Sequence, residues 1–273
     1  MFNVCYIKRT FAATCFSAVL LTLATPASAN TSFTNGNFES VSGHLTSFSL
    51  EDPAGNLTAL TGWNILGTPN ASQILNCVVI GGATTNMCGT VAFGGNFSLW
   101  ANPGQSPNGG NYYMADGDDS TTDTITQPGG YGLPLYQTVT GVVSGATYDV
   151  SFYQAAAQQN GFTGATTEQW EVAFCPSLPC SAGNTQYSNL MSDANHSDVT
   201  WASQGLQTLS FTATAATEVL EFIALGLPNG DPPFVMLDGV TLTQLTPEPG
   251  TYMLIGLGLL AIPLAGRLLK KRP

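Results

Sequence analysis

Short strand-like runs, each bounded by turn-forming residues, constrain the fold of this chain more than any other feature. The runs are rich in β-branched and aromatic residues, and clusters of Gly, Asn, Pro and Ser separate them. They cover residues 73–80, 96–101, 112–115, 135–140, 147–154, 169–174, 207–212, 219–225 and 234–244. In one run Tyr148, Val150 and Phe152 share a face, because side chains alternate along a strand. About nine such strands predict an all-β fold, an antiparallel β-sandwich or jelly roll.

Cationic residues lie only at the two ends of the chain. Residues 30–266 contain no Lys or Arg, yet they hold all 17 acidic residues. Nucleic-acid binding needs clustered cations, so this region is not predicted to bind nucleic acid. A catalytic Lys and an Arg clamp on phosphate are excluded as well. The chain as a whole has 44% hydrophobic and 8% charged residues, so this region is predicted to fold, and its length fits one domain.

The N-terminus has the three parts of a secretory signal peptide. Lys8 and Arg9 form a basic start, residues 11–23 are apolar, and residues 27–29 read Ala-Ser-Ala, a small-x-small cleavage sequence. An uncleaved N-terminal anchor is the alternative, but the apolar run is short for a membrane span. Residues 1–29 are therefore predicted to be a signal peptide.

The C-terminus has the composition of a membrane span. Residues 251–266 are an uninterrupted apolar run, and a basic cluster follows it. With Leu268 and Leu269 included, the run is just long enough to cross a bilayer of about 30 Å as a single transmembrane helix. The cations are expected to stay in the cytoplasm, so the domain before the span faces outward.

Immediately before this span the sequence reads Pro247-Glu248-Pro249. A Pro-Glu-Pro tripeptide, a short apolar span and a basic terminus, in this order, resemble the PEP-CTERM sorting signal of Gram-negative bacteria. The resemblance covers residues 247–273 and leaves residues 30–246 as the ectodomain. It implies that a membrane-embedded exosortase reads the signal and removes the tail. The inner membrane would then hold the protein transiently, before it reaches the cell envelope or extracellular matrix. A permanent anchor with a chance Pro-Glu-Pro is the alternative.

The ectodomain cysteines agree with export. They are Cys77, Cys88, Cys175 and Cys180. Close spacing favours disulfides between Cys77 and Cys88 and between Cys175 and Cys180 in an oxidising compartment, although other connectivities are allowed. A zinc site fits less well, because neither pair has two-residue spacing and oxidation would compete.

Two short motifs near the ends of the ectodomain point to one kind of jelly roll. Residues 35–39 (NGNFE) are predicted to lie in the first strand, Trp63 follows, and residues 237–242 (LDGVTL) lie in the last strand. These motifs resemble galactose-binding-like jelly rolls, which include many carbohydrate-binding modules. In that fold the first and last strands lie close together and often bind a structural calcium. The resemblance makes Glu39 and Asp238 the candidate Ca²⁺ ligands. The alternative is that Glu39 caps a turn and Asp238 accepts backbone amides.

A second acidic cluster follows the run at residues 112–115. Asp116 and Asp118 stand at alternate positions of a Gly-containing segment, and carboxylates so spaced could bind Ca²⁺. The spacing lacks the complete EF-hand pattern and its bidentate Glu. A solvated acidic loop is the alternative.

Aromatic side chains are the residues with which sugar-binding proteins hold their ligands, because pyranose rings stack on Trp and Tyr. The candidates are Trp100, Trp170 and Tyr131, the last in a Gly-rich loop. Aromatic residues in strands can equally be core residues, since burial is favourable. Support for catalysis is slight, because the chain has no Gly-x-Ser-x-Gly elbow, no His-Glu-x-x-His sequence and no phosphate loop.

The sequence therefore predicts a non-catalytic exported protein that binds exopolysaccharide or another glycan. Two alternatives stay open: a structural or adhesive surface protein without a discrete ligand site, and a glycoside hydrolase that uses a pair of carboxylates. Because residues 30–266 lack Lys and Arg, direct contact with an anionic polysaccharide would be repulsive. The ligand is expected to be a neutral glycan, or an anionic one bridged by Ca²⁺.

Overall fold

The structure is a computed structural model that describes residues 31–41, 60–66, 76–79, 87–89, 96–101, 103–117, 134–180, 182–228 and 231–245. The predicted signal peptide and the Pro-Glu-Pro tail lie outside these residues. Within them, no helix is long and apolar enough to cross a membrane. The elements in the described part are almost all strands, which confirms the predicted all-β class.

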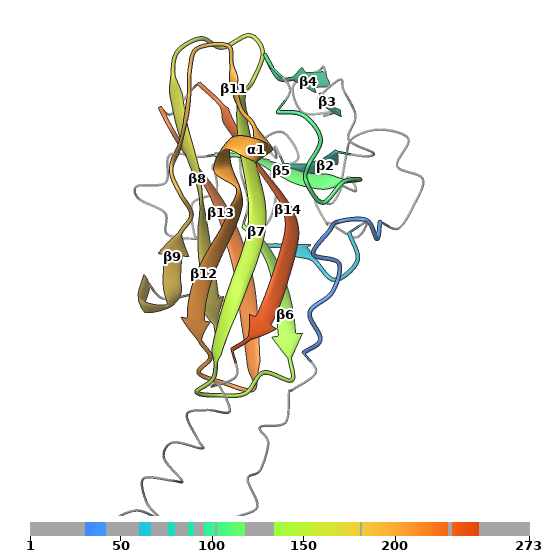
Figure 1. The fold of residues 1–273 in the computed structure, drawn as a ribbon, viewed down its shortest axis with the longest axis vertical. Helices are drawn as coiled ribbons and strands as arrows, with labels where there is room; N and C mark the ends of the chain where they lie inside the picture. The colour runs from blue at the N-terminus through green and yellow to red at the C-terminus, as the bar shows by residue number, and fades with distance from the viewer. Residues whose placement is uncertain are drawn as a thin grey trace, which may run out of the picture.

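Two antiparallel sheets pack face to face as a sandwich (Figure 1). In the first sheet the strand order is β1-β6-β13-β8-β10, and β9 pairs with β8. The strands of this sheet are β1 (Asn64–Ile65), β6 (Leu135–Thr140), β8 (Thr166–Cys175), β9 (Thr185–Tyr187), β10 (Met191–Asp193) and β13 (Thr217–Leu227). A short 3-10 helix, η2 (Ala182–Asn184), precedes β9.

In the second sheet the strand order is β11-β7-β14-β5-β2, and β12 pairs with β7. Its strands are β2 (Asn76–Val79), β5 (Tyr112–Asp116), β7 (Thr147–Gln158), β11 (Asp198–Val199), β12 (Leu206–Thr212) and β14 (Pro233–Gln244). A separate hairpin consists of β3 (Met87–Gly89) and β4 (Asn96–Ser98). The predicted antiparallel sandwich is therefore confirmed.

The predicted strands correspond to the long strands of the structure. The predicted run 135–140 is β6, and the other predicted runs overlap β2, β4, β5, β7, β8, β12, β13 and β14. The sequence did not predict β1, β3, β9, β10 or β11, which have only two or three residues each. Runs this short cannot show an alternation of side chains, so their pairing depends on the neighbouring strand.

The segment predicted as the first strand, residues 35–39, forms a turn instead. Phe38 N–H donates to the Asn35 carbonyl oxygen at 3.2 Å. Both residues have φ of 53°, the left-handed region, which a strand does not allow. The NGNFE sequence therefore specifies a turn beside the sandwich.

The main core fills the space between the two sheets. Tyr148, Val150 and Phe152 of β7 are fully buried and belong to it, as their alternation predicted. On the opposing sheet, Trp170 of β8 packs edge-on against Phe222 of β13, with ring centroids 5.9 Å apart. The Phe222 ring also meets Phe152 of β7 edge-on at 5.3 Å, a contact that joins the two sheets.

A second apolar cluster covers the outer face of the second sheet. It consists of alternate residues of β5, β7 and β14 together with Val79 of β2, with Leu99 and with Trp201 of α1 (Trp201–Gln204). The Trp201 ring meets Tyr112 edge-on at 5.3 Å, and its Nε1 donates to the Gly104 carbonyl oxygen at 3.1 Å. Side chains of the protein itself thus cover this part of the sheet face.

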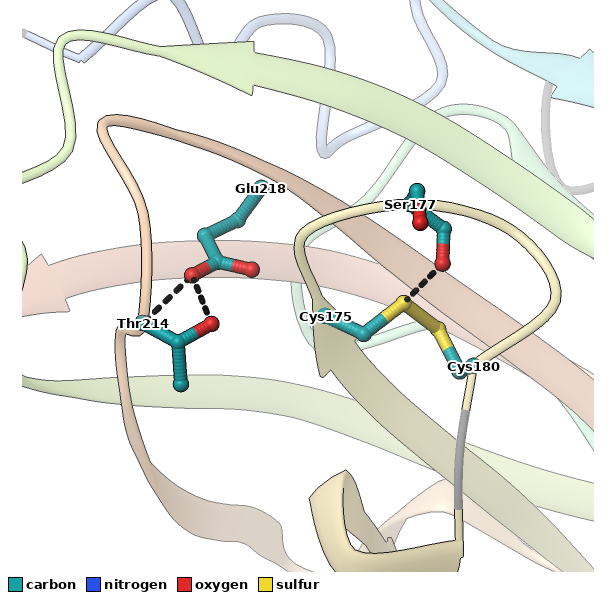
Figure 2. The surroundings of a disulfide bond; sticks show 5 residues. All are labelled: Cys175, Ser177, Cys180, Thr214 and Glu218. Atoms are coloured by element: carbon teal, nitrogen blue, oxygen red, sulfur yellow. Dashed lines mark hydrogen bonds between the residues drawn. A yellow bond between two sulfur atoms is a disulfide. The ribbon is translucent and has the colours of Figure 1, made fainter.

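One predicted disulfide lies within the described residues. Cys175 at the end of β8 is bonded to Cys180, with a Cα–Cα distance of 5.5 Å (Figure 2). Inside the loop, the Ser177 carbonyl oxygen lies 3.2 Å from Cys175 Sγ. The structure therefore supports this pairing. The side chains of Cys77 and Cys88 lie outside the described part, and their disulfide stays a prediction.

A buried carboxylate organises the turn beside this disulfide (Figure 2). Glu218 Oε1 accepts hydrogen bonds from Thr214 N–H at 2.5 Å, Thr214 Oγ1 at 3.0 Å and Ala215 N–H at 2.8 Å. The disulfide and this hydrogen-bonded turn together stabilise one end of the sandwich.

Replacing both Cys175 and Cys180 with serine is expected to lower the free energy of unfolding by about 2 kcal/mol. The bond closes a very short loop, for which chain entropy predicts a contribution of this size. Urea unfolding followed by circular dichroism would measure the loss. An unchanged urea midpoint, or free thiols at both positions in the oxidised wild type, would contradict the assignment.

Candidate functional site

Glu39 and Asp238, the predicted calcium ligands, contact the same loop before β5. Asn111 N–H donates to Glu39 Oε1 at 2.6 Å, and Ser106 Oγ donates to Asp238 Oδ2 at 2.5 Å. Gly110 has φ of 71°, and a Cβ at this position would collide with the Glu39 carboxylate. The loop therefore accepts the Glu39 side chain only because residue 110 is glycine.

The turn that carries Glu39 is attached directly to the last strand. Val240 N–H donates to the Gly36 carbonyl oxygen at 2.8 Å, and Trp63 Nε1 donates to the Asn35 carbonyl oxygen at 2.9 Å. A Cβ at Gly36 would collide with the Val240 carbonyl oxygen. The two motifs that suggested the fold are therefore neighbours in space.

Asp238 is a carboxyl group held in an unfavourable environment. It is fully buried, and burial raises its pKa to about 7, an effect to which the negative charge of Glu39 adds. Hydrogen bonds from Ser106, Gly239 and Asn108 lower the pKa and offset part of this rise. Two carboxylates this close repel each other unless a proton or a cation lies between them. Oxygen ligands are those that Ca²⁺ prefers, so the residues present fit this ion.

The other acidic candidate has little structural support. Asp116 is the last residue of β5 and is buried, with 2% of its surface exposed. Asp118 lies outside the described residues. Nowhere in the described part of the chain do three His, Cys, Asp or Glu residues converge as a metal-binding group.

Trp100 is the aromatic candidate that the structure places on the surface. The side chain is 38% exposed, and its ring stacks on His196 with centroids 4.0 Å apart and an interplanar angle of 34°. Its Nε1 donates to the Phe162 carbonyl oxygen at 2.6 Å, and its backbone N–H donates to the Gln158 carbonyl oxygen at 3.0 Å. Trp100 is therefore a fixed ring with part of its surface open to solvent.

The sequence did not predict the residues that support this ring. His196 lies in the β10–β11 loop with φ of 60°, and Phe162 lies in the β7–β8 loop. Only folding brings these loops beside Trp100, which follows β4. No short-range pattern in the sequence links the three segments.

The other two aromatic candidates do not form a surface site in the described structure. Trp170 was a candidate for sugar stacking, but its side chain is 0% exposed and its Nε1 donates to the Met236 carbonyl oxygen at 3.0 Å. It is a core residue, because its position on β8 points between the sheets. Tyr131 lies outside the described residues.

The sequence also missed a buried acidic pair between the sheets. Glu168 of β8 and Asp193 of β10 are 0% and 2% exposed. Burial raises the pKa of Glu168 to about 8; the Thr166 hydroxyl lowers it, and the charge of Asp193 raises it. Burial likewise raises the pKa of Asp193. The signal in the sequence was Glu168 at an inward position of a strand whose other inward residues are mostly apolar.

Comparison with known protein families identifies the C-terminal segment. The family described as "PEP-CTERM protein-sorting motif" matches this chain over residues 245–272. Residues 245–272 carry a PEP-CTERM sorting motif. The match confirms the resemblance seen in the sequence and indicates a secreted protein with a C-terminal sorting signal. Among curated proteins, no significant sequence match was found.

Several solved structures are similar to the sandwich. One contains the CBM22-1 and GH10 modules of Clostridium thermocellum endo-1,4-β-D-xylanase 10B with xylohexaose, at 15% identity and a TM-score of 0.32; the match covers 68% of this chain but only 26% of that one. Another is the N-terminal cellulose-binding domain of Cellulomonas fimi β-1,4-glucanase C, at 15% identity and a TM-score of 0.23, covering 50% and 80%. A third is the K3 cleaved adhesin domain of Lys-gingipain from Porphyromonas gingivalis, at 12% identity and a TM-score of 0.28, covering 64% and 92%.

Proposed function

We propose that this PEP-CTERM protein is an exported, non-catalytic glycan-binding module of the cell envelope or exopolysaccharide matrix. Its sorting motif supports processing by an exosortase, which would leave the sandwich as the working part. The proposed function requires no covalent step. The most buried carboxyl groups in the described part of the chain are shielded from solvent.

The observation that carries the proposal is the fixed, partly exposed ring of Trp100. Sugar rings stack on tryptophan through their C–H faces. Because His196 and the Phe162 carbonyl already hold the ring, binding costs little additional side-chain entropy.

The charge of the ectodomain determines which glycans fit. Residues 30–266 contain no Lys or Arg, so an anionic polymer would be repelled. We therefore propose a neutral glycan, or an anionic glycan bridged by Ca²⁺. In the second case a chelator would release the protein from isolated matrix, whereas in the first it would not.

We also propose a structural Ca²⁺ between Glu39 and Asp238. The ion would neutralise the two carboxylates and hold the 35–39 turn against β14. The high pKa of Asp238 and the absence of Lys and Arg from residues 30–266 support this assignment, because no Lys or Arg of this region can pair with Asp238.

Trp100→Ala is expected to weaken glycan binding about tenfold or more, the loss that corresponds to about 1.4 kcal/mol of stacking energy. A glycan array followed by calorimetry on the best hit would measure it. Tyr187→Ala is the matched control, since Tyr187 is an exposed aromatic residue, 54% accessible, on β9. Equal binding by the Trp100 variant would overturn the assignment of this ring. An array without any hit would favour a structural or adhesive role. Hydrolysis of polysaccharide by the protein, lost when one carboxylate is substituted, would favour the glycoside hydrolase.

A further inference from the structure

One end of the sandwich carries Leu245, the residue at which the sorting motif begins. In Figure 1, β6, β12 and β14 end at this end, whereas β11 and the β3–β4 hairpin lie at the other. Hydrogen bonds tie its segments together. Leu245 N–H donates to the Thr147 carbonyl oxygen at 2.8 Å, and Ser32 N–H donates to the Thr140 carbonyl oxygen at 3.0 Å. We call this surface the tail-side end, and it consists of residues 31–34, 140–147, 175–180, 212–217 and 243–245.

The tail-side end carries no charge. Its five segments contain no acidic residue, although the chain has 17 of them, and no Lys or Arg. Glu218, which follows one segment, is buried and accepts hydrogen bonds from the turn before it. At the opposite end, Asp198 of β11 and Asp231 before β14 are partly exposed. The tail-side end is therefore a neutral surface on an anionic domain.

Apolar side chains project from this neutral surface. Val143, in the loop between β6 and β7, is 39% exposed, and Leu245 is 44% exposed. Pro176 and Pro179 of the disulfide loop are exposed as well. Moving such side chains from water into an apolar medium is favourable. Aliphatic tips among Ser, Thr and Gly residues suit the boundary between lipid headgroups and acyl chains.

The length of the tail limits how far this end can lie from a membrane. Only residues 246–250 separate Leu245 from the apolar run that the sequence predicts to be a membrane span. Five residues extend at most about 18 Å. In the tethered protein the tail-side end is therefore held next to the bilayer. The ring of Trp100 lies at the far end, because β7 begins at Thr147 and its last residue, Gln158, bonds to Trp100.

We propose that the tail-side end is a membrane-docking surface that lies on a phospholipid bilayer, with Val143 and Leu245 inserted at the headgroup level. The proposal rests on the exported, tethered state of the proposed function, but not on glycan binding. Carboxylates at this end would be repelled by anionic lipids, and a neutral end avoids that repulsion. Docking directs the Trp100 end away from the membrane, toward the matrix.

Quenching of tryptophan fluorescence by brominated phospholipids tests the proposal. The full-length protein is reconstituted in vesicles of phosphatidylethanolamine and phosphatidylglycerol, with or without bromine on the acyl chains. Val143→Trp adds a reporter to the tail-side end. Leu227→Trp is the matched control, since Leu227 is 45% exposed and ends β13 at the opposite end. Side chains at such an interface lie about 5–10 Å into the headgroup and acyl boundary, so the added emission should be quenched about threefold more strongly in Val143→Trp.

A second reporter separates docking from mere proximity to the membrane. Ala216→Trp marks the neighbouring turn, where the Ala216 carbonyl oxygen accepts from Val142 N–H at 3.2 Å. It also replaces Val143→Trp as the reporter if that variant does not fold. Adding Val143→Asp to Ala216→Trp should lower the quenching, because it places a carboxylate in the docking surface, whereas Val143→Thr should preserve it.

Three results would overturn the docking surface. They are equal quenching in Val143→Trp and Leu227→Trp, quenching of Ala216→Trp that Val143→Asp leaves unchanged, and a full-length chain that does not float with the vesicles. A glycan array without any hit would instead overturn the proposed function alone, because docking does not involve Trp100.

Discussion

Trp170→Ala is expected to lower the free energy of unfolding by about 4 kcal/mol. The side chain is fully buried, and its ring lies 5.9 Å from Phe222 and 6.2 Å from Tyr113. Its Nε1 donates to the Met236 carbonyl oxygen, a bond that joins β8 to β14 across the core. Alanine would leave a large cavity and remove this connection between the sheets. Urea unfolding followed by far-ultraviolet circular dichroism would measure the effect.

Trp100→Ala is the matched control, because it removes the same side chain from the surface. It is expected to cost less than about 1 kcal/mol, as substitutions at partly exposed positions usually do. The two variants should therefore separate stability from binding: Trp170→Ala loses stability, and Trp100→Ala loses glycan affinity. Similar losses of stability in both would contradict the placement of Trp170 in the core.

We compare the protein with Ca²⁺ at a hundredfold excess over its dissociation constant and the protein in chelator. Removing calcium is expected to lower the free energy of unfolding by about 2–3 kcal/mol. For a domain of this size the melting temperature should fall by about 5–10 °C. The cause is repulsion between Glu39 and Asp238, which the ion would otherwise neutralise. Differential scanning calorimetry with CaCl₂ and with chelator would measure the shift.

Two variants give this experiment its controls. Asp238→Asn should retain less of the calcium response. Asp149→Asn should keep all of it, because Asp149 lies on β7 outside the proposed site and accepts a hydrogen bond from Ser210 Oγ. Identical melting curves for the wild type with and without chelator would contradict the proposed calcium site.

The long strands could be predicted because their side chains alternate locally. In β7 the inward residues Tyr148, Val150 and Phe152 are all apolar, and in β6 buried and exposed positions alternate although the inward Gln137 is polar. The two-residue strands β1 and β11 carry no such pattern and exist only through pairing with β6 and β7. The turn at residues 35–39 was wrongly predicted as a strand, because its conformation depends on Gly36 fitting against Val240.

The candidate site was predictable only in part. Glu39 and Asp238 were recognised through short motifs, and the structure brings both to one loop. Whether Trp100 or Trp170 faced solvent could not be decided from the sequence, since a predicted strand has two faces and either can be buried. The buried pair of Glu168 and Asp193 was missed because the two residues lie far apart in the sequence.

Composition and order along the chain were enough to indicate a secreted protein with a C-terminal sorting motif, the all-β class and a region, residues 30–266, without Lys or Arg. These properties depend on local patterns and sums, which do not change on folding. The partners of each acidic residue and the exposure of each aromatic ring depend instead on packing between distant strands. Folding therefore decided that Trp100 is a surface ring supported by His196, and that Glu168 and Asp193 share a buried space without a cationic side chain.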